Sequence, residues 1–336
     1  MLRRETADAP ARRAAALAGL AAYQRAPRLP RPAPLPIVAR AGRAVLRDYG
    51  GTGPPAVFVP SLINPPFILD LAPDNSLLRW LAGQGVRPLL VEWGPPAPAA
   101  DASAAAAGPD VAGHVADLLL PLLAALGTLV HLVGYCLGGT MAIAAAMHAP
   151  LLSLTAIAAP WRFGGFGAAA RADIAALWSA AQPACATLGL VPMEVLQAGF
   201  WQLDPGRTVA KFEAFGRMDP DSSAARAFVA LEDWANAGDP LTLAAGRELL
   251  EDFVAEDRPG RGLWRVAGVA VLPGRIAVPA REFVSRNDRI VPAASAAGLA
   301  AQVSLGLGHV GMIVGSRARD ALWRPLAASL SQVTIS

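Results

Sequence analysis

Residues 134–140 read Gly-Tyr-Cys-Leu-Gly-Gly-Thr and hold the side chain of this sequence that is best suited to nucleophilic chemistry. Cys136 follows an apolar run typical of a buried strand and precedes an alanine-rich stretch typical of a helix. Gly134 and Gly138 flank it, as a tight strand-to-helix turn requires, because larger side chains would collide there. The thiol would project at a helix N-terminus, where the helix dipole favours the thiolate. The pattern predicts a cysteine nucleophile, and simple packing of a small buried thiol is the alternative.

An acid and a histidine follow the cysteine, in the order in which triads built on a parallel sheet supply nucleophile, acid and base. Asp288 comes just after an apolar run that ends at Ser285, and His309 lies in Gly-His-Val-Gly at 308–311. Both are expected on loops next to strands or helices, as triad geometry demands. Packing explains the other histidines and the second cysteine: His114, His131, His148 and Cys185. The predicted catalytic residues are Cys136, Asp288 and His309.

Two backbone N–H groups would be needed to stabilise the oxyanion that forms when a thiolate attacks a carbonyl. One is expected on the residue after the nucleophile and one on the loop after an earlier strand. Residues 59–64 read Val-Pro-Ser-Leu-Ile-Asn and form that loop. Proline has no N–H and is excluded. The candidates for the oxyanion hole are Leu137, Leu62 and Ile63.

Strands and helices alternate from residue 44 onward, which is typical of α/β proteins with a mostly parallel sheet. The predicted strands are 44–49, 56–60, 87–93, 129–134, 154–159 and 277–285. The predicted helices are 76–83, 110–126, 139–148 and 317–330. The alternation breaks between residues 161 and 275, where helical patterns occur at 194–201 and 224–235. This segment is expected to form a helical cap over the edge of the sheet where ligands bind.

The expected organisation has four parts. Residues 1–43 form a basic N-terminal arm and a proline-rich linker, 44–161 the first part of the α/β core, 162–275 the helical cap insertion and 276–336 the second part of the core. The arm is expected to contain a short basic amphipathic helix that contacts a partner or an apolar surface, or else to be a frayed, solvated end.

Composition and charge exclude several classes of protein. The chain has 336 residues, 54% hydrophobic and 16% charged, with a net charge of +3, which indicates a globular fold. The positive charge is concentrated in residues 1–47, which hold ten arginines. The rest of the chain therefore offers no basic face for binding nucleic acid. Residues 118–161 carry no Asp, Glu, Lys or Arg, but prolines and glycines divide them into pieces too short for a membrane span. Two unrelated cysteines indicate reduced thiols and a cytoplasmic protein.

These motifs together resemble those of the polyhydroxyalkanoate (poly-3-hydroxybutyrate) synthases, members of the α/β-hydrolase superfamily with a cysteine nucleophile. The segments that carry the resemblance are 134–140, 60–71 (Pro-Ser-Leu-Ile-Asn-Pro-Pro-Phe-Ile-Leu-Asp-Leu), 75–80, 91–95, 288–292 and 308–311. The similarity covers most of 45–161 and 275–315 and is faint in the insertion. It implies an α/β-hydrolase fold with a cap.

The resemblance implies that Cys136 carries the acyl group, that His309 is the base, and that Asp288 orients His309 or helps to activate the incoming hydroxyl. Such enzymes transfer 3-hydroxyacyl groups from coenzyme A to a growing polyester and need no metal or redox cofactor. Their products form cytoplasmic granules. The length is nearer to the forms that work with a second synthase subunit, so that subunit or a homodimer is the expected partner. The family often has an aromatic residue, His and Trp at the positions of Leu62, Arg289 and Ala293, so the acyl preference stays open.

Two other readings remain. The first is a cysteine hydrolase on the same fold, either an acyl-CoA thioesterase or an esterase like the dienelactone hydrolases. Those lactonases are compact, whereas the insertion at 162–275 favours the synthase. The second is a catalytically silent, granule-associated protein that retains the fold.

Overall fold

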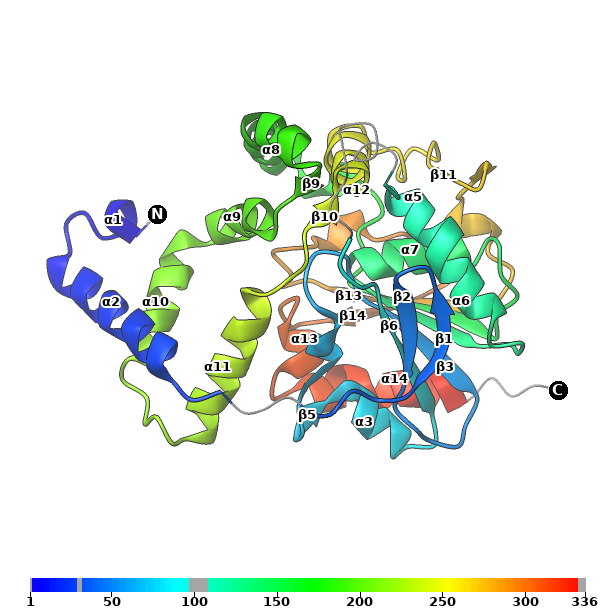
Figure 1. Cartoon of the computed structure of the whole chain (residues 1–336), viewed down its shortest axis with the longest axis horizontal. Coiled ribbons are helices and arrows are strands. Elements are labelled where there is room, and N and C mark those ends of the chain that lie inside the picture. Colours follow the sequence, from blue (N-terminus) through cyan, green and yellow to red (C-terminus); the bar gives the residue numbers. More distant parts are fainter. Residues whose placement is uncertain (1, 29–31, 97–107, 332–336) are drawn as a thin grey trace.

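The computed structural model describes residues 2–28, 32–96 and 108–331. Within these residues, eight strands form one sheet in the order β1-β2-β6-β3-β7-β8-β13-β14, and those from β6 to β14 are parallel (Figure 1). The antiparallel hairpin of β1 and β2 extends it at one edge. The strands are β1 Ile37–Ala41, β2 Ala44–Asp48, β3 Pro55–Val59, β6 Arg87–Glu92, β7 His131–Tyr135, β8 Ser153–Ile157, β13 Ala280–Ser285 and β14 Ala301–Leu305. The expected α/β architecture is confirmed.

The six strands that the sequence predicts are all present, with ends shifted by up to three residues. The two edge strands β1 and β14 were not predicted. β1 lies within the segment expected to be linker, where prolines and arginines hide its short alternating pattern. β14 is largely exposed and therefore lacks the apolar run that marks a buried strand.

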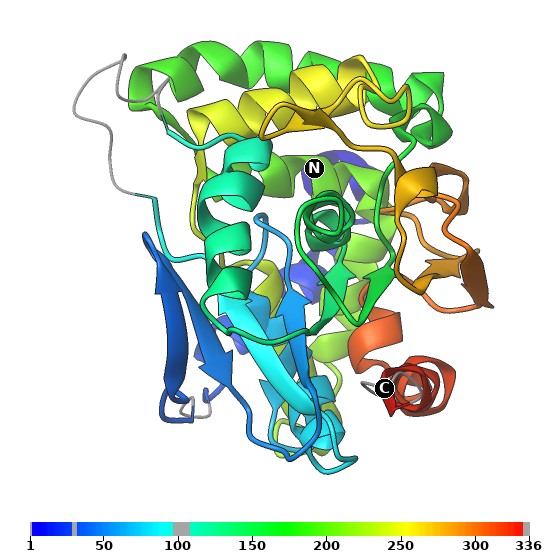
Figure 2. The same cartoon turned by 90° about the vertical axis from the view of Figure 1, so that its right-hand side faces the viewer.

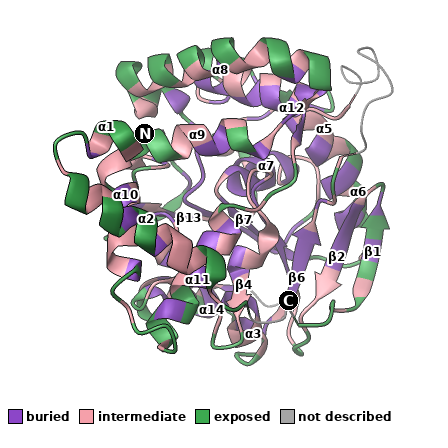
Figure 3. Ribbon diagram, turned by 60° about the vertical axis from the view of Figure 1, so that its left-hand side comes forward, coloured by how far each residue is buried: buried purple, intermediate pink, exposed green. Residues whose placement is uncertain are grey.

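Helices cover both faces of the sheet. One face packs against α5 Val111–Gly113, the π-helical turn His114–Leu119, α6 Leu120–Ala124 and α7 Leu137–Ala145. The other face packs against α3 Leu77–Ala82, α13 Gly311–Val314, the turn Arg319–Trp323 and α14 Arg324–Ser331. β7 and α7 are almost wholly buried, as Figure 3 shows. The predicted helices 76–83, 110–126, 139–148 and 317–330 are confirmed.

Between β8 and β13 the chain leaves the sheet. Its helices there are α8 Ala168–Leu188, α9 Met193–Leu203, α10 Pro205–Phe215, α11 Ser223–Ala235 and α12 Leu243–Arg247, which continues as a π-helical segment, Glu248–Ala255. Figure 2 shows α8 and the α12 segment lying side by side across the top of the molecule. We call α8 to α11 the cap helices. The short elements are β4 Asp70–Ala72, β5 Asn75–Ser76, β9 Leu190–Val191, β10 Leu241–Thr242, β11 Arg265–Val266, β12 Val269–Ala270 and the 3-10 turns Pro66–Leu69, Phe163–Phe166, Pro273–Arg275 and Ala293–Ser295.

The N-terminal arm forms α1 Leu2–Glu5 and α2 Pro10–Arg25, and α2 lies along α10 (Figure 1). A Cβ at Gly19 would lie 1.8 Å from the carbonyl oxygen of Phe212, so glycine lets the two helices approach closely. The Tyr23 hydroxyl donates to Asp233 at 2.6 Å. The expectation of a frayed, solvated end is therefore wrong. The helix does contact an apolar surface, but that surface belongs to its own chain. Residues 29–31 of the predicted linker, Pro30 among them, lie outside the described residues.

Candidate active site

Cys136 lies between the end of β7 and the start of α7, in a backbone conformation that side chains rarely adopt. Its φ is +56° and its ψ is −132°, so the turn holds a strained non-glycine residue, a feature that clusters at functional sites. A Cβ at Gly134 would lie 2.4 Å from the Gly138 carbonyl oxygen, and one at Gly138 would lie 2.1 Å from that of Val59. The requirement for glycine on both sides is thus confirmed. Cys136 is partly exposed and reduced.

His309 and Asp288 meet beside this turn. Asp288 follows β13 on a loop, and His309 lies between β14 and α13. The imidazole Nδ1 and the Asp288 Oδ2 are 2.6 Å apart. The other carboxylate oxygen of Asp288 accepts from the N–H groups of Ile290 and Val291, both at 2.8 Å. With its lone pairs engaged in this way, the buried carboxylate fixes the ring so that Nδ1 carries a proton and Nε2 is left for other partners.

The Cys136 sulfur lies close enough to His309 to act on the pKa of its imidazole. The structure therefore brings the three predicted catalytic residues together. Burial alone would lower the pKa of His309, and it is the largest single influence. The negative charges of Cys136 and Asp288 and their hydrogen bonds outweigh it and raise the pKa of His309 to about 10. At neutral pH the imidazole of His309 therefore holds a proton.

The residues proposed for the oxyanion hole come from two separate parts of the chain. Leu137 is the first residue of α7, where backbone N–H groups have no partner within the helix. Leu62 and Ile63 lie on the loop between β3 and the 3-10 turn Pro66–Leu69. The N–H of Ile63 donates to Ser61 Oγ at 3.1 Å, so it would have to exchange that partner for an oxyanion. Leu62 has no such competing side chain within its loop.

One of the cap helices, α11, contacts this loop directly. The indole N–H of Trp234, on α11, donates to the carbonyl oxygen of Pro65 at 2.9 Å. The Asn64 side chain reaches the carbonyl oxygens of Ala235 and Ala237 at 3.5 and 3.4 Å. The sequence did not single out these contacts, although an indole within an amphipathic helix usually seeks an acceptor when buried.

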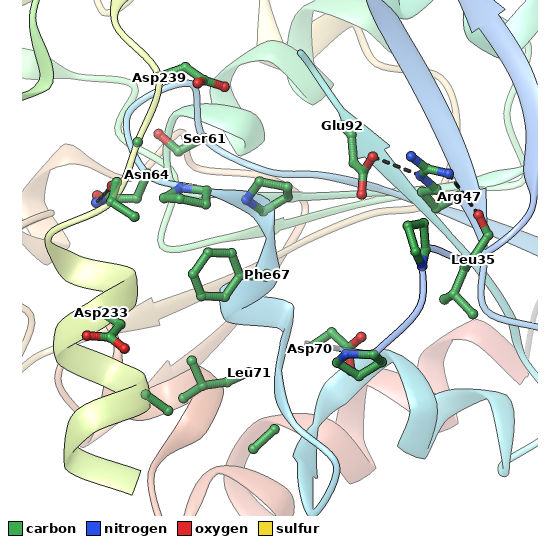
Figure 4. A pocket seen from close by; sticks show the side chains of 18 of the residues that line it. Leu35, Arg47, Ser61, Asn64, Phe67, Asp70, Leu71, Glu92, Asp233 and Asp239 are labelled. Atoms are coloured by element: carbon green, nitrogen blue, oxygen red, sulfur yellow. Dashed lines mark hydrogen bonds and ion pairs between the residues drawn. The ribbon is translucent and has the colours of Figure 1, made fainter. Parts of the chain in front are cut away.

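A cavity of about 1320 Å³ opens beside the same loop (Figure 4). Leu62 and Asn64 line it together with residues of α11, β2, β6 and the segment 65–75. In Figure 4, Asp233 of α11 stands opposite Phe67 and Leu71, and the ion pair of Arg47 with Glu92 lies at the far side. Cys136 is not among the lining residues.

The other histidines and the second cysteine have the environments that the sequence predicts. His114 is buried, and burial lowers its pKa to about 4. His131 is buried in β7, where Ser153 Oγ lies 2.8 Å from Nδ1 and burial lowers the pKa of the imidazole. His148 is half-buried after α7, and Cys185 is buried in α8. Packing therefore accounts for these four residues.

No cluster of three or more His, Cys, Asp or Glu side chains in the described ranges is arranged to hold a metal ion. No helix among the described residues has the length and apolar character that crossing a bilayer takes.

The amino-acid sequence is similar to those of known proteins. No model of a protein family matches the chain. The chain is 26% identical over 287 residues to the poly(3-hydroxyalkanoate) polymerase subunit PhaC of Haloferax mediterranei, covering 80% of this chain and 57% of that one. It is 24% identical over 291 residues to PhaC of Haloarcula marismortui, covering 83% and 61%. The chain thus spans about three fifths of the length of these two relatives.

Solved structures share the fold. A monoacylglycerol lipase of Paleococcus ferrophilus aligns with a TM-score of 0.51 and 13% identity over 87% of this chain and 99% of that one. A thermophilic esterase of Thermogutta terrifontis aligns with a TM-score of 0.50 and 15% identity over 90% and 100%. At such identities the likeness concerns the fold alone. The chain therefore has the α/β-hydrolase fold, and its sequence resembles the polyhydroxyalkanoate polymerase subunits named PhaC.

Proposed function

We propose that this protein is a polyhydroxyalkanoate synthase-like acyltransferase. It moves 3-hydroxyacyl groups from coenzyme A, through a thioester on Cys136, to the end of a growing polyester. The observation that carries the proposal is the contact of Cys136 with a His309 that Asp288 holds, in a chain whose sequence relatives are PhaC polymerase subunits. Acyl-CoA is the substrate, and the proposed chemistry calls for no cofactor.

The first half of the reaction starts from the ion pair. The Cys136 sulfur attacks the thioester carbonyl, and the negative charge passes to the carbonyl oxygen, which the N–H groups of Leu137 and of Leu62 or Ile63 stabilise. One such donor typically contributes about 3–4 kcal/mol. Collapse of the intermediate breaks the bond to the coenzyme A sulfur, and the His309 imidazolium gives that sulfur its proton. The acyl group is then on Cys136, and His309 is neutral.

In the second half, neutral His309 accepts the proton of a hydroxyl group that attacks the acyl-Cys136 thioester. General base catalysis of this kind typically contributes about 10²–10⁴-fold. The oxyanion forms at the same N–H groups. Collapse releases the Cys136 thiolate and forms the ester, which restores the ion pair with the proton on His309. Asp288 stays ionised and keeps Nδ1 protonated throughout.

Sulfur suits this sequence of transfers. Exchange of one thioester for another changes the free energy little, so the acyl group on Cys136 stays activated for the second attack. A serine in its place would convert the acyl group to an ordinary ester, from which the second transfer loses its driving force. The thiol in this glycine-flanked turn therefore supports transfer to an alcohol.

A polymerase must also keep water away from the acyl-enzyme. We assign this role to residues 162–275 as a cap insertion between the two parts of the α/β core, with residues 1–43 as a separate arm. Support comes from α11, whose Trp234 is bonded to Pro65 beside the proposed oxyanion residues. The cap and the oxyanion loop would then move as one unit.

The partner and the location are part of the same proposal. The relatives carry the word subunit in their names, and the chain spans only part of their length. We propose that the protein works with a second synthase subunit or as a homodimer. Its place would be the cytoplasm, at the surface of the polyester granules that it makes.

The test is incubation of the purified protein with 3-hydroxybutyryl-CoA, following coenzyme A release and identifying the product. Insoluble polyester supports the synthase. Free 3-hydroxybutyrate in place of polymer would assign the same site to a cysteine hydrolase, a thioesterase or an esterase. No release of coenzyme A would leave a silent, granule-associated protein.

A further inference from the structure

We propose that Tyr135, the residue before Cys136, is a positioning residue for His309 that holds both its ring and its backbone. Tyr135 is the last residue of β7, and His309 lies on the loop between β14 and α13. The two are 174 positions apart in sequence. The inference rests on the proposed function only for its acyl-transfer readout.

The ring contact is close. The phenol ring of Tyr135 and the imidazole of His309 are stacked with centroids 5.0 Å apart and planes inclined by 27°. Both residues are buried, with exposed fractions of 4% and 7%. An aromatic face attracts a cation lying over it, so this ring stabilises the imidazolium form of the base. The ring also blocks rotation of the imidazole out of the plane that Asp288 sets.

The backbone contact helps to order the loop that carries His309. Glycines at 306, 308 and 311 surround His309, and such residues lose the most conformational freedom on ordering. The carbonyl oxygens from Gly306 to Val310 each accept a hydrogen bond: Gly306 from Asn287, Leu307 from Ser285, Gly308 from the N–H of Met312, and Val310 from those of Ile313 and Val314. That of His309 itself accepts from the Tyr135 hydroxyl at 3.2 Å.

This bond joins the base to the strand that carries the nucleophile. Tyr135 and Cys136 are consecutive, so their peptide link fixes the spacing between the thiol and the group that holds His309. The hydroxyl itself does not take part in proton transfer. Burial, and next the charges of Cys136 and Asp288, raise the pKa of Tyr135 well above its ordinary value, so the phenol keeps its proton. Its role is geometric, and it acts through His309.

Two substitutions separate the contacts. Tyr135→Phe keeps the ring and removes the hydroxyl, and Tyr135→Leu removes the ring as well. Tyr23→Phe is the matched control, because it deletes the hydroxyl of another tyrosine that donates a hydrogen bond, on α2 and outside the triad. For Tyr135→Phe we expect faster amide hydrogen exchange in the peptide containing 306–310, by roughly threefold to tenfold, as the loss of one hydrogen bond implies. Tyr23→Phe leaves that peptide unchanged.

The ring is tested by the ¹⁵N NMR titration of His309, assigned by the loss of its signal in His309→Gln. We expect Tyr135→Leu to lower the pKa of His309, whereas Tyr135→Phe leaves it unchanged. With 3-hydroxybutyryl-CoA, Tyr135→Phe should lower kcat by roughly threefold to tenfold at an unchanged KM.

Two results would overturn the inference: an unchanged exchange rate at 306–310 in Tyr135→Phe, or an unchanged pKa of His309 in Tyr135→Leu. A general loss of stability in either variant would not mimic the expected pattern, because it would not confine faster exchange to 306–310. Exchange and titration need no substrate. If the parent protein releases no coenzyme A, the proposed function fails while both measurements still decide the role of Tyr135.

Discussion

At the scale of single residues, the chemistry depends on the state of one proton. Cys136 and His309 form a pair in which the imidazole is charged at neutral pH, because the sulfur and Asp288 outweigh the effect of burial. The charged imidazole therefore lies beside the proposed nucleophile before substrate arrives. This arrangement needs a nucleophile more acidic than a hydroxyl, which explains why a cysteine fits the turn and its partners.

Replacing the sulfur tests the nucleophile. Cys136→Ala should reduce coenzyme A release by roughly 10⁴-fold or more, as the removal of a covalent nucleophile does in other enzymes. Cys136→Ser should be nearly inactive in polymer formation, because the ester intermediate is less activated. Cys185→Ala is the control, since Cys185 is a buried thiol in α8, and it should retain activity. Release by Cys136→Ala at the parental rate would refute the proposed role.

The charge of His309 gives a second prediction at this scale. The pKa of His309 should lie near 10 in the parent protein and fall in Cys136→Ala, because the sulfur charge is the largest influence that raises it. The stabilisation from this pair is complete below the ordinary histidine pKa of about 6.5 and is lost as the pH rises towards 10. A ¹⁵N NMR titration of His309 measures both values. An unchanged pKa in Cys136→Ala would show that the sulfur carries no charge beside the ring.

At the scale of the elements, α11 and the loop after β3 are connected by hydrogen bonds. The Trp234 indole N–H donates a hydrogen bond to the carbonyl oxygen of Pro65, so α11 and the loop with Leu62 and Ile63 share a contact. A cap that shifted would pull on the proposed oxyanion donors. Closure of the cap and formation of the oxyanion hole are therefore expected to be linked.

Trp234→Phe removes the N–H that donates to Pro65, together with part of the indole ring, and should lower kcat for coenzyme A release by roughly threefold to tenfold. Trp178→Phe on α8 is the matched control, because it deletes an indole N–H that donates to Glu251 at 2.8 Å. It should leave kcat unchanged. Steady-state kinetics of both variants with 3-hydroxybutyryl-CoA give the comparison. Equal loss in the two variants would mean that the cap acts only through general stability.

The central elements and the three catalytic candidates were predictable from sequence because their signals are local. Gly134, Cys136 and Gly138 form a steric pattern, and buried parallel strands are continuous apolar runs. The edge strands β1 and β14 lacked that run. The stacking of Tyr135 on His309 could not be predicted, since 174 positions separate them and only the sheet order brings them together.

At the scale of the whole molecule, one buried acid links the segment after α12 to the core. Glu248 accepts from the N–H of Ala112 at 2.9 Å and from the Trp264 indole at 2.8 Å. Burial, and next the charge of Asp110, raise the pKa of Glu248 to about 7. The folded protein therefore holds a proton that the unfolded chain releases at lower pH.

The free energy of unfolding should fall as the pH rises from about 4.5 to about 7, by about 3 kcal/mol from this group alone. Glu248→Gln keeps the shape and removes the titration, so its stability should depend less on pH in that window. Glu251→Gln, which alters another acceptor of a tryptophan N–H, is the control. Urea denaturation at pH 5 and pH 8 measures the difference. The same pH dependence in Glu248→Gln and the parent would contradict the prediction.

The packing of α2 on the cap helices determines how the protein can be shortened. The Tyr23 ring packs against the rings of Phe212, Phe215 and Phe228. The Arg28 guanidinium donates hydrogen bonds to both carboxylate oxygens of Asp233. A chain truncated to begin at β1 would expose these three rings to water and would remove α2, the helix that packs along α10. Such a truncated protein would self-associate through this exposed aromatic surface, even though every residue of the proposed triad is retained.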